Sequence, residues 1–342
     1  MIKGHGDDAY RYGKKMKANF SSNVYNKVNI EGLKAHLCKC MNEIGSYPEP
    51  EPYSLEAKLA IIKDLNSKEV CVTNGATEAI YLIAQAFRGA DTAILQPTFS
   101  EYADACLIHG HNVSSIFSLP DKKESYLLSE EIQTLWLCNP NNPTGKVYDI
   151  DRLQMVIEHN PKVCFIIDQS YEFFTFAKTF SAKEAASFPN LFLLHSMTKR
   201  YAIPGLRLGY ITGNPALLQR LRNHRMPWSV NQLAIEAGLF FLDNPQEAPI
   251  NLHAYLEETK RLRSNLKSLG IEVLETQTHF MLASLCKGKA SELKDYLAKE
   301  HGILIRDASN FEGLDERFFR VATQTPKEND LLVAAISQWI DN

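Results

Sequence analysis

The stretch HSMTKRYAIPGLRLGY, residues 195–210, is the part of the chain around which the rest is organised. The apolar run at 191–194 predicts a buried strand that leads into a polar loop presenting Lys199. A Pro-Gly pair then interrupts the chain before Arg207, and a strand resumes over 206–211. A lysine on a tight loop between hydroxyls and an arginine suits a cofactor with a phosphate tail. Taken alone, the same pair would also fit a solvated loop lysine and a surface arginine.

Short apolar strands alternate with helical patterns over the first half of the chain. Strands are expected at 70–72, 93–95, 135–138 and 163–167, and the helices between them at 77–87, 100–109 and 150–157. This alternation predicts an α/β fold with a mostly parallel sheet that is covered by helices on both faces. Ligands of such sheets bind beyond the carboxyl ends of the strands, where the polar motifs of this chain fall.

The pattern outside this region suggests three segments. Residues 1–30 form an arm that belongs to a small domain, 31–245 a large domain, and 246–342 a small α+β domain. Helices are expected at 30–41, from a cap at Ser54 to 62, at 251–269, at 292–299 and from 328, with strands at 280–283, 303–305 and 318–321.

Composition excludes several classes of protein. The 342 residues carry a formal net charge of -3, with no basic surface for nucleic acid. The seven cysteines include no Cys-x-x-Cys, and Cys38 and Cys40 have a poor spacing for a shared metal, so we expect no metal site. The N-terminus lacks an apolar signal core, and no apolar run approaches the length of a membrane span. We therefore expect a cytoplasmic protein without a membrane partner.

A possible phosphate site follows the first strand of this region. Gly75, Ala76 and Thr77 open a helix, whose backbone N–H groups can hold a phosphate together with the threonine hydroxyl. Gly followed by Thr at a helix start is also an ordinary cap, so this motif alone is weak.

Two further motifs lie at strand ends. The string NPNNPTG, residues 139–145, fixes a rigid turn and supplies amides that can donate to a phenolate oxygen. Asp168 ends a strongly apolar strand, where a buried carboxylate needs a partner such as a protonated pyridine nitrogen. Tyr171 follows three residues later. The plain alternative for Asp168 is a helix cap.

Together, Ser-x-x-Lys, Pro-Gly-x-Arg-x-Gly-Tyr, Asn-Pro-x-Asn-Pro-Thr-Gly and Asp-x-x-Tyr make the chain resemble the aspartate aminotransferase superfamily. The resemblance spans residues 19–323 and implies a pyridoxal 5′-phosphate (PLP) enzyme of fold type I. Lys199 would bind PLP as a Schiff base, Asp168 its ring nitrogen, and Asn142 and Tyr171 its ring oxygen. Phe99 would stack on the ring, although a core phenylalanine is the equal alternative. The cofactor phosphate would be held by Gly75, Ala76, Thr77, Ser196 and Arg207.

Members of this superfamily are homodimers with shared active sites. The resemblance matches Tyr47 to the tyrosine that reaches the cofactor phosphate of the neighbouring subunit. By its own chemistry Tyr47 could equally be a packed loop tyrosine. One departure is Gln169-Ser170, where the family usually has Glu-Ala, but the flanking Asp and Tyr are kept.

The predicted substrate carries two anionic groups. Arg320 is a charge inside an apolar strand and matches the arginine that binds the substrate carboxylate, and Arg306 can bind a second anion. Asn23 matches a pocket asparagine. This favours the subgroup of threonine-phosphate decarboxylases of cobalamin synthesis and histidinol-phosphate aminotransferases.

The N-terminal arm favours the decarboxylases, whose His-Gly-Gly arm places a histidine near the substrate phosphate. His5 matches that histidine, although Asp7 stands where the second glycine would be. We therefore expect L-threonine O-3-phosphate decarboxylation, with transamination as the alternative. A sensor domain of a transcription regulator is disfavoured because no DNA-binding module precedes the first helix. Loss of activity is disfavoured because the catalytic set is complete.

Overall fold

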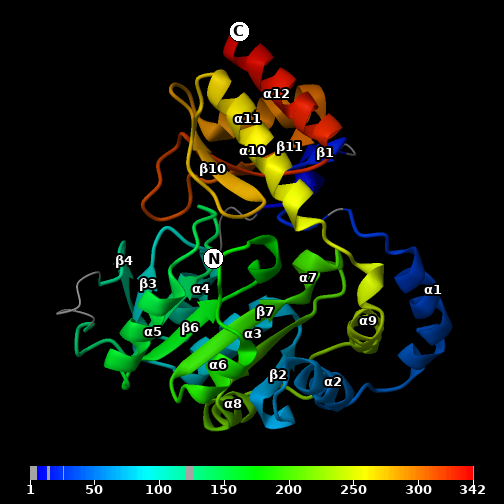
Figure 1. Cartoon of the computed structure of the whole chain (residues 1–342), viewed down its shortest axis with the longest axis vertical. Coiled ribbons are helices and arrows are strands. Elements are labelled where there is room, and N and C mark those ends of the chain that lie inside the picture. The colour runs from blue at the N-terminus through cyan, green and yellow to red at the C-terminus, as the bar shows by residue number, and fades with distance from the viewer. Residues whose placement is uncertain (1–5, 14–15, 26, 121–126, 342) are drawn as a thin grey trace.

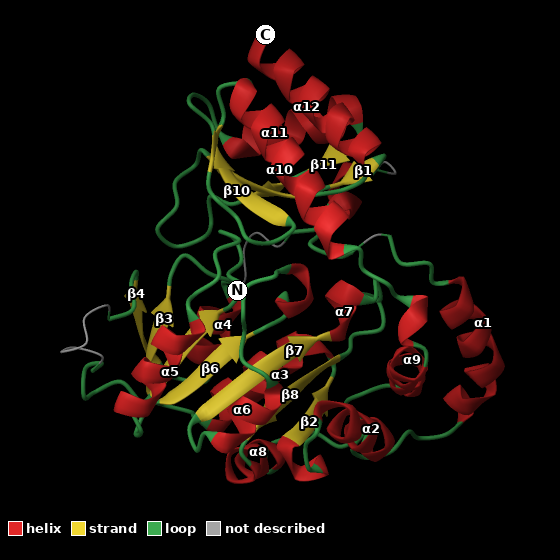
Figure 2. Cartoon of the chain, in the orientation of Figure 1, coloured by secondary structure: helices red, strands yellow, loops and turns green. Residues whose placement is uncertain are grey.

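The computed structural model describes residues 6–13, 16–25, 27–120 and 127–341. A large sheet with its helices lies below a small sheet with its own helices in Figure 1. The carboxyl ends of the long parallel strands point toward the small sheet (Figure 2). The space between the two sheets is therefore where ligands of this fold class would bind.

The larger sheet has seven strands in the order β2-β8-β7-β6-β5-β3-β4. Their bounds are β2 Val70–Thr73, β3 Asp91–Leu95, β4 Asn112–Ile116, β5 Thr134–Cys138, β6 Cys164–Asp168, β7 Leu191–Ser196 and β8 Gly209–Gly213. The strand β8 runs opposite to all the others and pairs antiparallel with both β2 and β7, whereas the remaining pairs are parallel. The predicted mostly parallel α/β sheet is confirmed.

Helices surround this sheet: α1 Glu31–Cys40, α2 Tyr53–Lys63, α3 Gly75–Ala86, α4 Glu101–Ile108, α5 Ile150–His159, α6 Ala182–Ser187, α7 Met197–Arg200, α8 Pro215–Arg222 and α9 Gln232–Asp243. Alternate side chains of a strand point to opposite faces of the sheet, where they pack against different helices. In β6, Phe165 and Ile167 belong to the core that contains α5 and α6. Cys164 and Ile166 belong to the core that contains α3, α4 and α8. Because β6 is buried on both faces, its residues form a continuous hydrophobic run up to Asp168 at its end.

The smaller sheet is antiparallel, in the order β12-β13-β10-β9. Its strands are β9 Glu272–Val273, β10 Phe280–Ser284, β12 Arg306–Asp307 and β13 Phe318–Ala322, and its helices are α10 Leu252–Ser268, α11 Ala290–Tyr296 and α12 Pro326–Asp341. The N-terminal strand β1, Ala18–Asn19, pairs in parallel with β11, Ile303–Leu304. This pairing brings the arm beside the C-terminal part of the chain. Within the described residues, no helix has both the length and the apolar character needed to cross a bilayer.

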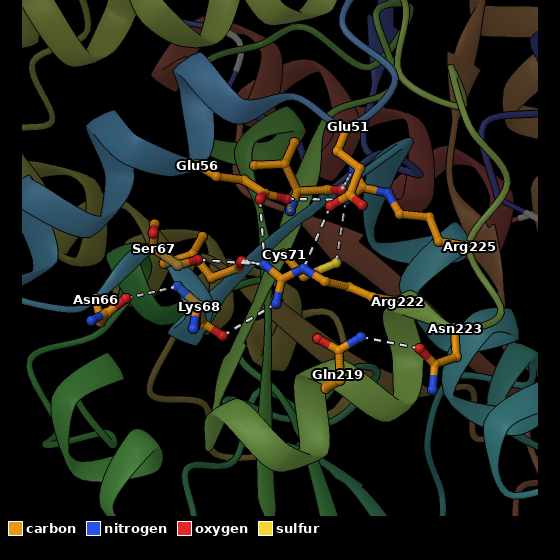
Figure 3. Close-up of polar contacts among 12 residues, drawn as sticks. Glu51, Glu56, Asn66, Ser67, Lys68, Cys71, Gln219, Arg222, Asn223 and Arg225 are labelled. Atoms are coloured by element: carbon orange, nitrogen blue, oxygen red, sulfur yellow. Dashed lines mark hydrogen bonds and ion pairs between the residues drawn. The ribbon is translucent and has the colours of Figure 1, made fainter.

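A buried ion network fastens the edge strand β2 (Figure 3). Glu56 of α2 accepts a hydrogen bond from the Val72 N–H of β2 at 2.9 Å. The same carboxylate pairs with Arg225 at 3.1 Å and with Arg222 of α8 at 3.3 Å. The side chains of Glu56 and Arg225 are only 5% and 3% exposed, so each charge depends on the other for compensation. The network thereby ties two helices to the strand that leads into Gly75.

Two local predictions were wrong. The helix assigned an N-cap at Ser54 begins at Tyr53 with Pro52 at its cap, and the Ser54 hydroxyl instead donates to Glu49 at 3.0 Å. Lys199 does not lie on an irregular loop but in the single helical turn α7, where the Tyr201 N–H donates to the carbonyl of Met197.

The segment 303–305 also differs from the single strand that we expected. Its first two residues form β11 and pair with β1, whereas the chain from Arg306 pairs with β13 in the other sheet. The edge strand β4 was not predicted, because its sequence, NVSSI, is mostly polar and half-exposed.

Candidate active site

A cavity of about 350 Å³ lies between the two sheets. Its walls come from the carboxyl ends of the large-sheet strands, from the N-terminal arm and from the small sheet. Most of the residues predicted from the sequence line it: Asn23, Ala76, Thr77, Phe99, Asn142, Asp168, Tyr171, Ser196, Lys199, Arg207, Arg306 and Arg320. Segments that are far apart in the sequence thus meet in one place.

Lys199 lies in the cavity wall on α7, directly after β7. Its backbone carbonyl accepts a hydrogen bond from the Tyr25 N–H at 2.8 Å, which links this turn to the arm. Burial, reinforced by Arg320 and Arg207, lowers the pKa of Lys199 to about 8. A lysine with such a pKa is uncharged more often near neutral pH, as a nucleophile or a base must be.

Asp168 is buried at the end of β6 and has two partners. Its Oδ2 accepts a hydrogen bond from the Tyr102 hydroxyl at 2.7 Å, and its Oδ1 accepts from the Ser170 N–H at 2.8 Å. Burial, with the carboxylate beside it, raises the pKa of Tyr102, so the hydroxyl stays protonated and donates. Sequence reasoning missed Tyr102, although a tyrosine hydroxyl on an apolar helix also needs a partner.

Tyr171 is oriented through a short chain of hydrogen bonds. The Asn23 amide donates to its hydroxyl at 3.3 Å, and His279 Nε2 donates to the Asn23 carbonyl at 3.1 Å. His279 is neutral because burial lowers its pKa to about 3. Its ring packs among Tyr171, Phe174 and Tyr255. His279 was not predicted, and its place directly before the predicted strand at 280–283 gave no sign of this contact.

Arg320 is buried on β13 and bridges two other segments. It donates to the Asn142 side-chain oxygen and to the Ser21 carbonyl. Its Nε is buried and has no hydrogen-bond partner among the described residues. Burial, then the neighbouring Arg306, lowers the pKa of Arg320 to about 10. A buried guanidinium with an N–H donor that lacks a partner is suited to binding an anionic ligand.

Arg306 is a second arginine of the same wall. It donates to the Asp307 carbonyl at 2.6 Å and to the Asn310 side chain at 2.8 Å. Its guanidinium lies 5.2 Å from the ring centre of Phe311. Burial lowers the pKa of Arg306 to about 10, a further sign of a cation that is incompletely compensated.

A third arginine lies at the start of α3. A Cβ added to Gly75 would lie 2.7 Å from Arg207 Nη2, so the glycine lets the guanidinium approach the helix N-terminus. Gly75 itself does not line the cavity, but the following Ala76 and Thr77 do. The Ser196 and Thr198 hydroxyls, 2.7 Å apart, lie in the same wall. Hydroxyls, helix N–H groups and an arginine form a set suited to a phosphate.

Another predicted residue, Tyr47, lies away from the cavity. It is 86% exposed, packs against Trp228 at 5.3 Å between ring centres, and does not line the cavity. His5 lies outside the described residues, but the next two positions, Gly6 and Asp7, do line the cavity. The Asp7 N–H donates to the Ser21 hydroxyl at 2.9 Å, which holds this part of the arm at the cavity.

The sequence pattern described as "Aminotransferase class I and II" matches residues 15–336. The chain belongs to this family. It is 30% identical over 327 residues to the threonine-phosphate decarboxylase of Salmonella typhimurium, covering 93% of this chain and 89% of that protein. It is 28% identical over 300 residues to the histidinol-phosphate aminotransferase of Parabacteroides distasonis, covering 85% of each. The solved L-threonine-O-3-phosphate decarboxylase of Porphyromonas gingivalis is 38% identical, with a TM-score of 0.91 over 95% of this chain and 100% of that one.

The cofactor of this family is PLP, and the cavity fits it. The hydroxyls, helix N–H groups and guanidinium around Arg207 would suit the cofactor's phosphate, and the Lys199 amine would suit its aldehyde. A buried aspartate with two hydrogen bonds can face a protonated ring nitrogen. Phe99 lies in the cavity wall, with its ring edge-to-face on Tyr102 at 5.8 Å.

Proposed function

We propose that this protein is a PLP-dependent decarboxylase of L-threonine O-3-phosphate, which serves cobalamin biosynthesis. The observation that carries the proposal is the pair of buried arginines, Arg306 and Arg320, in addition to Arg207 at the presumed cofactor phosphate. Two further cations call for a substrate with two anionic groups. Threonine phosphate has both a carboxylate and a phosphate, whereas histidinol phosphate has no carboxylate. Two of the relatives named above, both threonine-phosphate decarboxylases, support the same choice.

Different residues of the cavity bind the substrate, hold the cofactor and transfer the proton. When bound, PLP supplies a ring that accepts the electron pair of the bond broken at the substrate Cα. Asp168 keeps the ring nitrogen protonated, and Tyr102 and the Ser170 N–H hold that carboxylate in place. Arg320 binds the substrate carboxylate and Arg306 its phosphate. Lys199, with its lowered pKa, delivers the proton that replaces carbon dioxide at Cα.

Transamination is the second candidate, because the same residues serve it. Its support is the likeness to the histidinol-phosphate aminotransferase. The two reactions would differ in which bond at the substrate Cα breaks. Decarboxylation would release the carboxylate held by Arg320 as carbon dioxide, whereas in transamination Lys199 Nζ would take the Cα proton.

Product analysis separates the two reactions. The PLP-loaded protein is incubated with L-threonine O-3-phosphate and no keto acid. Over many turnovers we expect carbon dioxide and aminopropanol phosphate in equal amounts. One half-turnover, which leaves an aminated cofactor and a keto product, would instead establish a transaminase. Histidinol phosphate with 2-oxoglutarate would then be the next pair of substrates.

We further propose that the protein acts in the cytoplasm as a homodimer. The exposed Tyr47 and Trp228 pair supports a dimer, since such aromatic side chains are enriched at protein interfaces. In this arrangement Tyr47 would contribute its hydroxyl to the partner's cofactor phosphate.

A further inference from the structure

A second cluster of chemically reactive side chains lies where α1 packs against α9, at the right of Figure 1. His36 and Cys40 are four residues apart on α1 and therefore share one face of that helix. Glu236 faces them from α9. None of the three lines the cavity of Lys199. Within the described part of the chain, this is the one group of three such ligands that converge closely enough to hold a metal ion.

The distances between the ligand atoms match the edges of a tetrahedral metal site. His36 Nε2 lies 3.0 Å from Glu236 Oε2, Cys40 Sγ lies 3.7 Å from His36 Nε2, and Cys40 Sγ lies 3.6 Å from Glu236 Oε2. For Zn²⁺ with ordinary bond lengths, tetrahedral edges are about 3.3 Å between nitrogen and oxygen, and about 3.6 Å to sulfur. Each edge therefore needs a shift of only a few tenths of an ångström.

Neighbouring groups hold the ligands in orientation. The Gln232 amide donates to the other carboxylate oxygen of Glu236 at 3.2 Å and to Glu43 at 2.9 Å. The His36 ring packs on Phe240 at 5.3 Å between ring centres. Metal ligands in proteins are commonly oriented by such outer contacts. The two glutamates also make the local charge favourable for a cation.

The cluster is partly open to water, as a metal site with a solvent ligand must be. Cys40 is 8% exposed, whereas the side chains of His36 and Glu236 are 32% and 18% exposed. The sequence predicted no metal, because the spacing of Cys38 and Cys40 does not suit a shared ion. Glu236, which completes the cluster with His36 and Cys40, comes from a helix about two hundred residues away.

We propose that His36, Cys40 and Glu236 bind one Zn²⁺ ion, with water as the fourth ligand. Thiolate, imidazole and carboxylate are all ordinary zinc ligands, and the thiolate and imidazole disfavour Mg²⁺ and Ca²⁺. On binding, the Cys40 thiol loses its proton to solvent. The neutral His36 ring then carries its proton on Nδ1, so that the Nε2 lone pair binds the ion in place of the hydrogen bond to Glu236. The ion cross-links α1 to α9. This role is independent of the reaction at Lys199.

The test measures zinc on the full-length, PLP-loaded protein. After chelator treatment, equilibrium dialysis against Zn²⁺ should load one ion per chain, and zinc-edge X-ray absorption should show one sulfur neighbour at about 2.3 Å. Loading that yields no sulfur neighbour would overturn the proposal, and so would the absence of saturable zinc.

Variants identify the ligands. Cys40→Ser should weaken zinc binding at least about tenfold, and Gln232→Ala about tenfold through loss of the outer contact. Cys38→Ser is the matched control, because Cys38 is exposed on the same helix and outside the cluster. Its affinity should equal that of the unaltered protein. An equal loss in Cys38→Ser, or none in Cys40→Ser, would contradict the assignment. Zinc should also raise the melting temperature of the unaltered protein and not that of Cys40→Ser.

Discussion

At the level of single residues, the buried amine of Lys199 has a thermodynamic consequence. Its pKa falls from 10.5 to about 8 in the folded protein. Between these values the unfolded chain binds more protons, so stability rises with pH. Below pH 8 the lysine is charged in both states, and burying that charge lowers the free energy of unfolding by about 3 kcal/mol.

Lys199→Met should therefore stabilise the cofactor-free protein at pH 7 by up to about 3 kcal/mol, because the buried charge is removed. The advantage should shrink as pH rises from 8 toward 10. Urea unfolding at pH 7 and pH 9.5 measures it. A difference that does not change with pH would contradict the lowered pKa.

The same lysine should determine the spectrum of the bound cofactor. Lys199→Ala removes the only amine placed in the cavity wall among the described residues, so the absorbance band of bound PLP near the visible edge should disappear. Lys267→Ala, at an exposed position on α10, is the control and should keep the band. If the band survives in Lys199→Ala, the assignment of the cofactor lysine is wrong.

The two substrate arginines should differ in their effect. Arg306→Ala should lower kcat/KM for phosphorylated substrates by roughly ten- to a hundredfold, as expected for a lost charged hydrogen bond. It should affect unphosphorylated amino acids far less. Arg320→Ala should impair both classes, because both carry the carboxylate. Steady-state kinetics with threonine and its phosphate measure the difference, and equal losses in Arg306→Ala would remove its phosphate role.

At the level of elements, the network of Figure 3 should matter for stability and not for chemistry. Glu56→Ala leaves Arg225 buried without its carboxylate and the Val72 N–H without its acceptor. A loss of about 3–5 kcal/mol in unfolding free energy is expected. Glu51 pairs with the same arginines but is 32% exposed, so Glu51→Ala should cost no more than about 1 kcal/mol. Chemical denaturation compares the two, and equal losses would refute the role of burial.

The helices and strands show which elements a local sequence pattern can predict. The strand β6 was predictable because burial on both faces makes its residues before Asp168 apolar. The edge strand β4 was not predictable, because its residues are mostly polar and half-exposed. It is a strand because it pairs with β3. The single turn α7 is too short for a helical period to show in the sequence.

At the level of the whole molecule, the proposed dimer makes a prediction about complementation. If Tyr47 serves the partner's cofactor, then Tyr47→Ala and Lys199→Ala should each reduce activity as pure proteins. After subunits are mixed and exchanged, hybrid dimers contain one intact site, so activity should return to roughly a quarter of normal. Mixing two Lys199→Ala preparations is the control. If no activity returns although subunit exchange is demonstrated, Tyr47 acts within its own subunit or not at all.

The division into an arm, a large domain and a small domain at residues 30 and 245 stays a prediction. The pairing of β1 with β11 supports placing the arm with the C-terminal segment.

The sequence by itself determined the α/β class and the strand ends at which the polar motifs fall. It did so because side-chain periodicity is local, and because the carboxyl ends of parallel strands share one edge of a sheet. Only the tertiary structure decided which distant side chains touch. Tyr102 reaches Asp168, and His279 reaches Asn23 across 256 positions. Such contacts depend on how separate elements pack against one another, and the spacing of residues along the chain does not determine those distances.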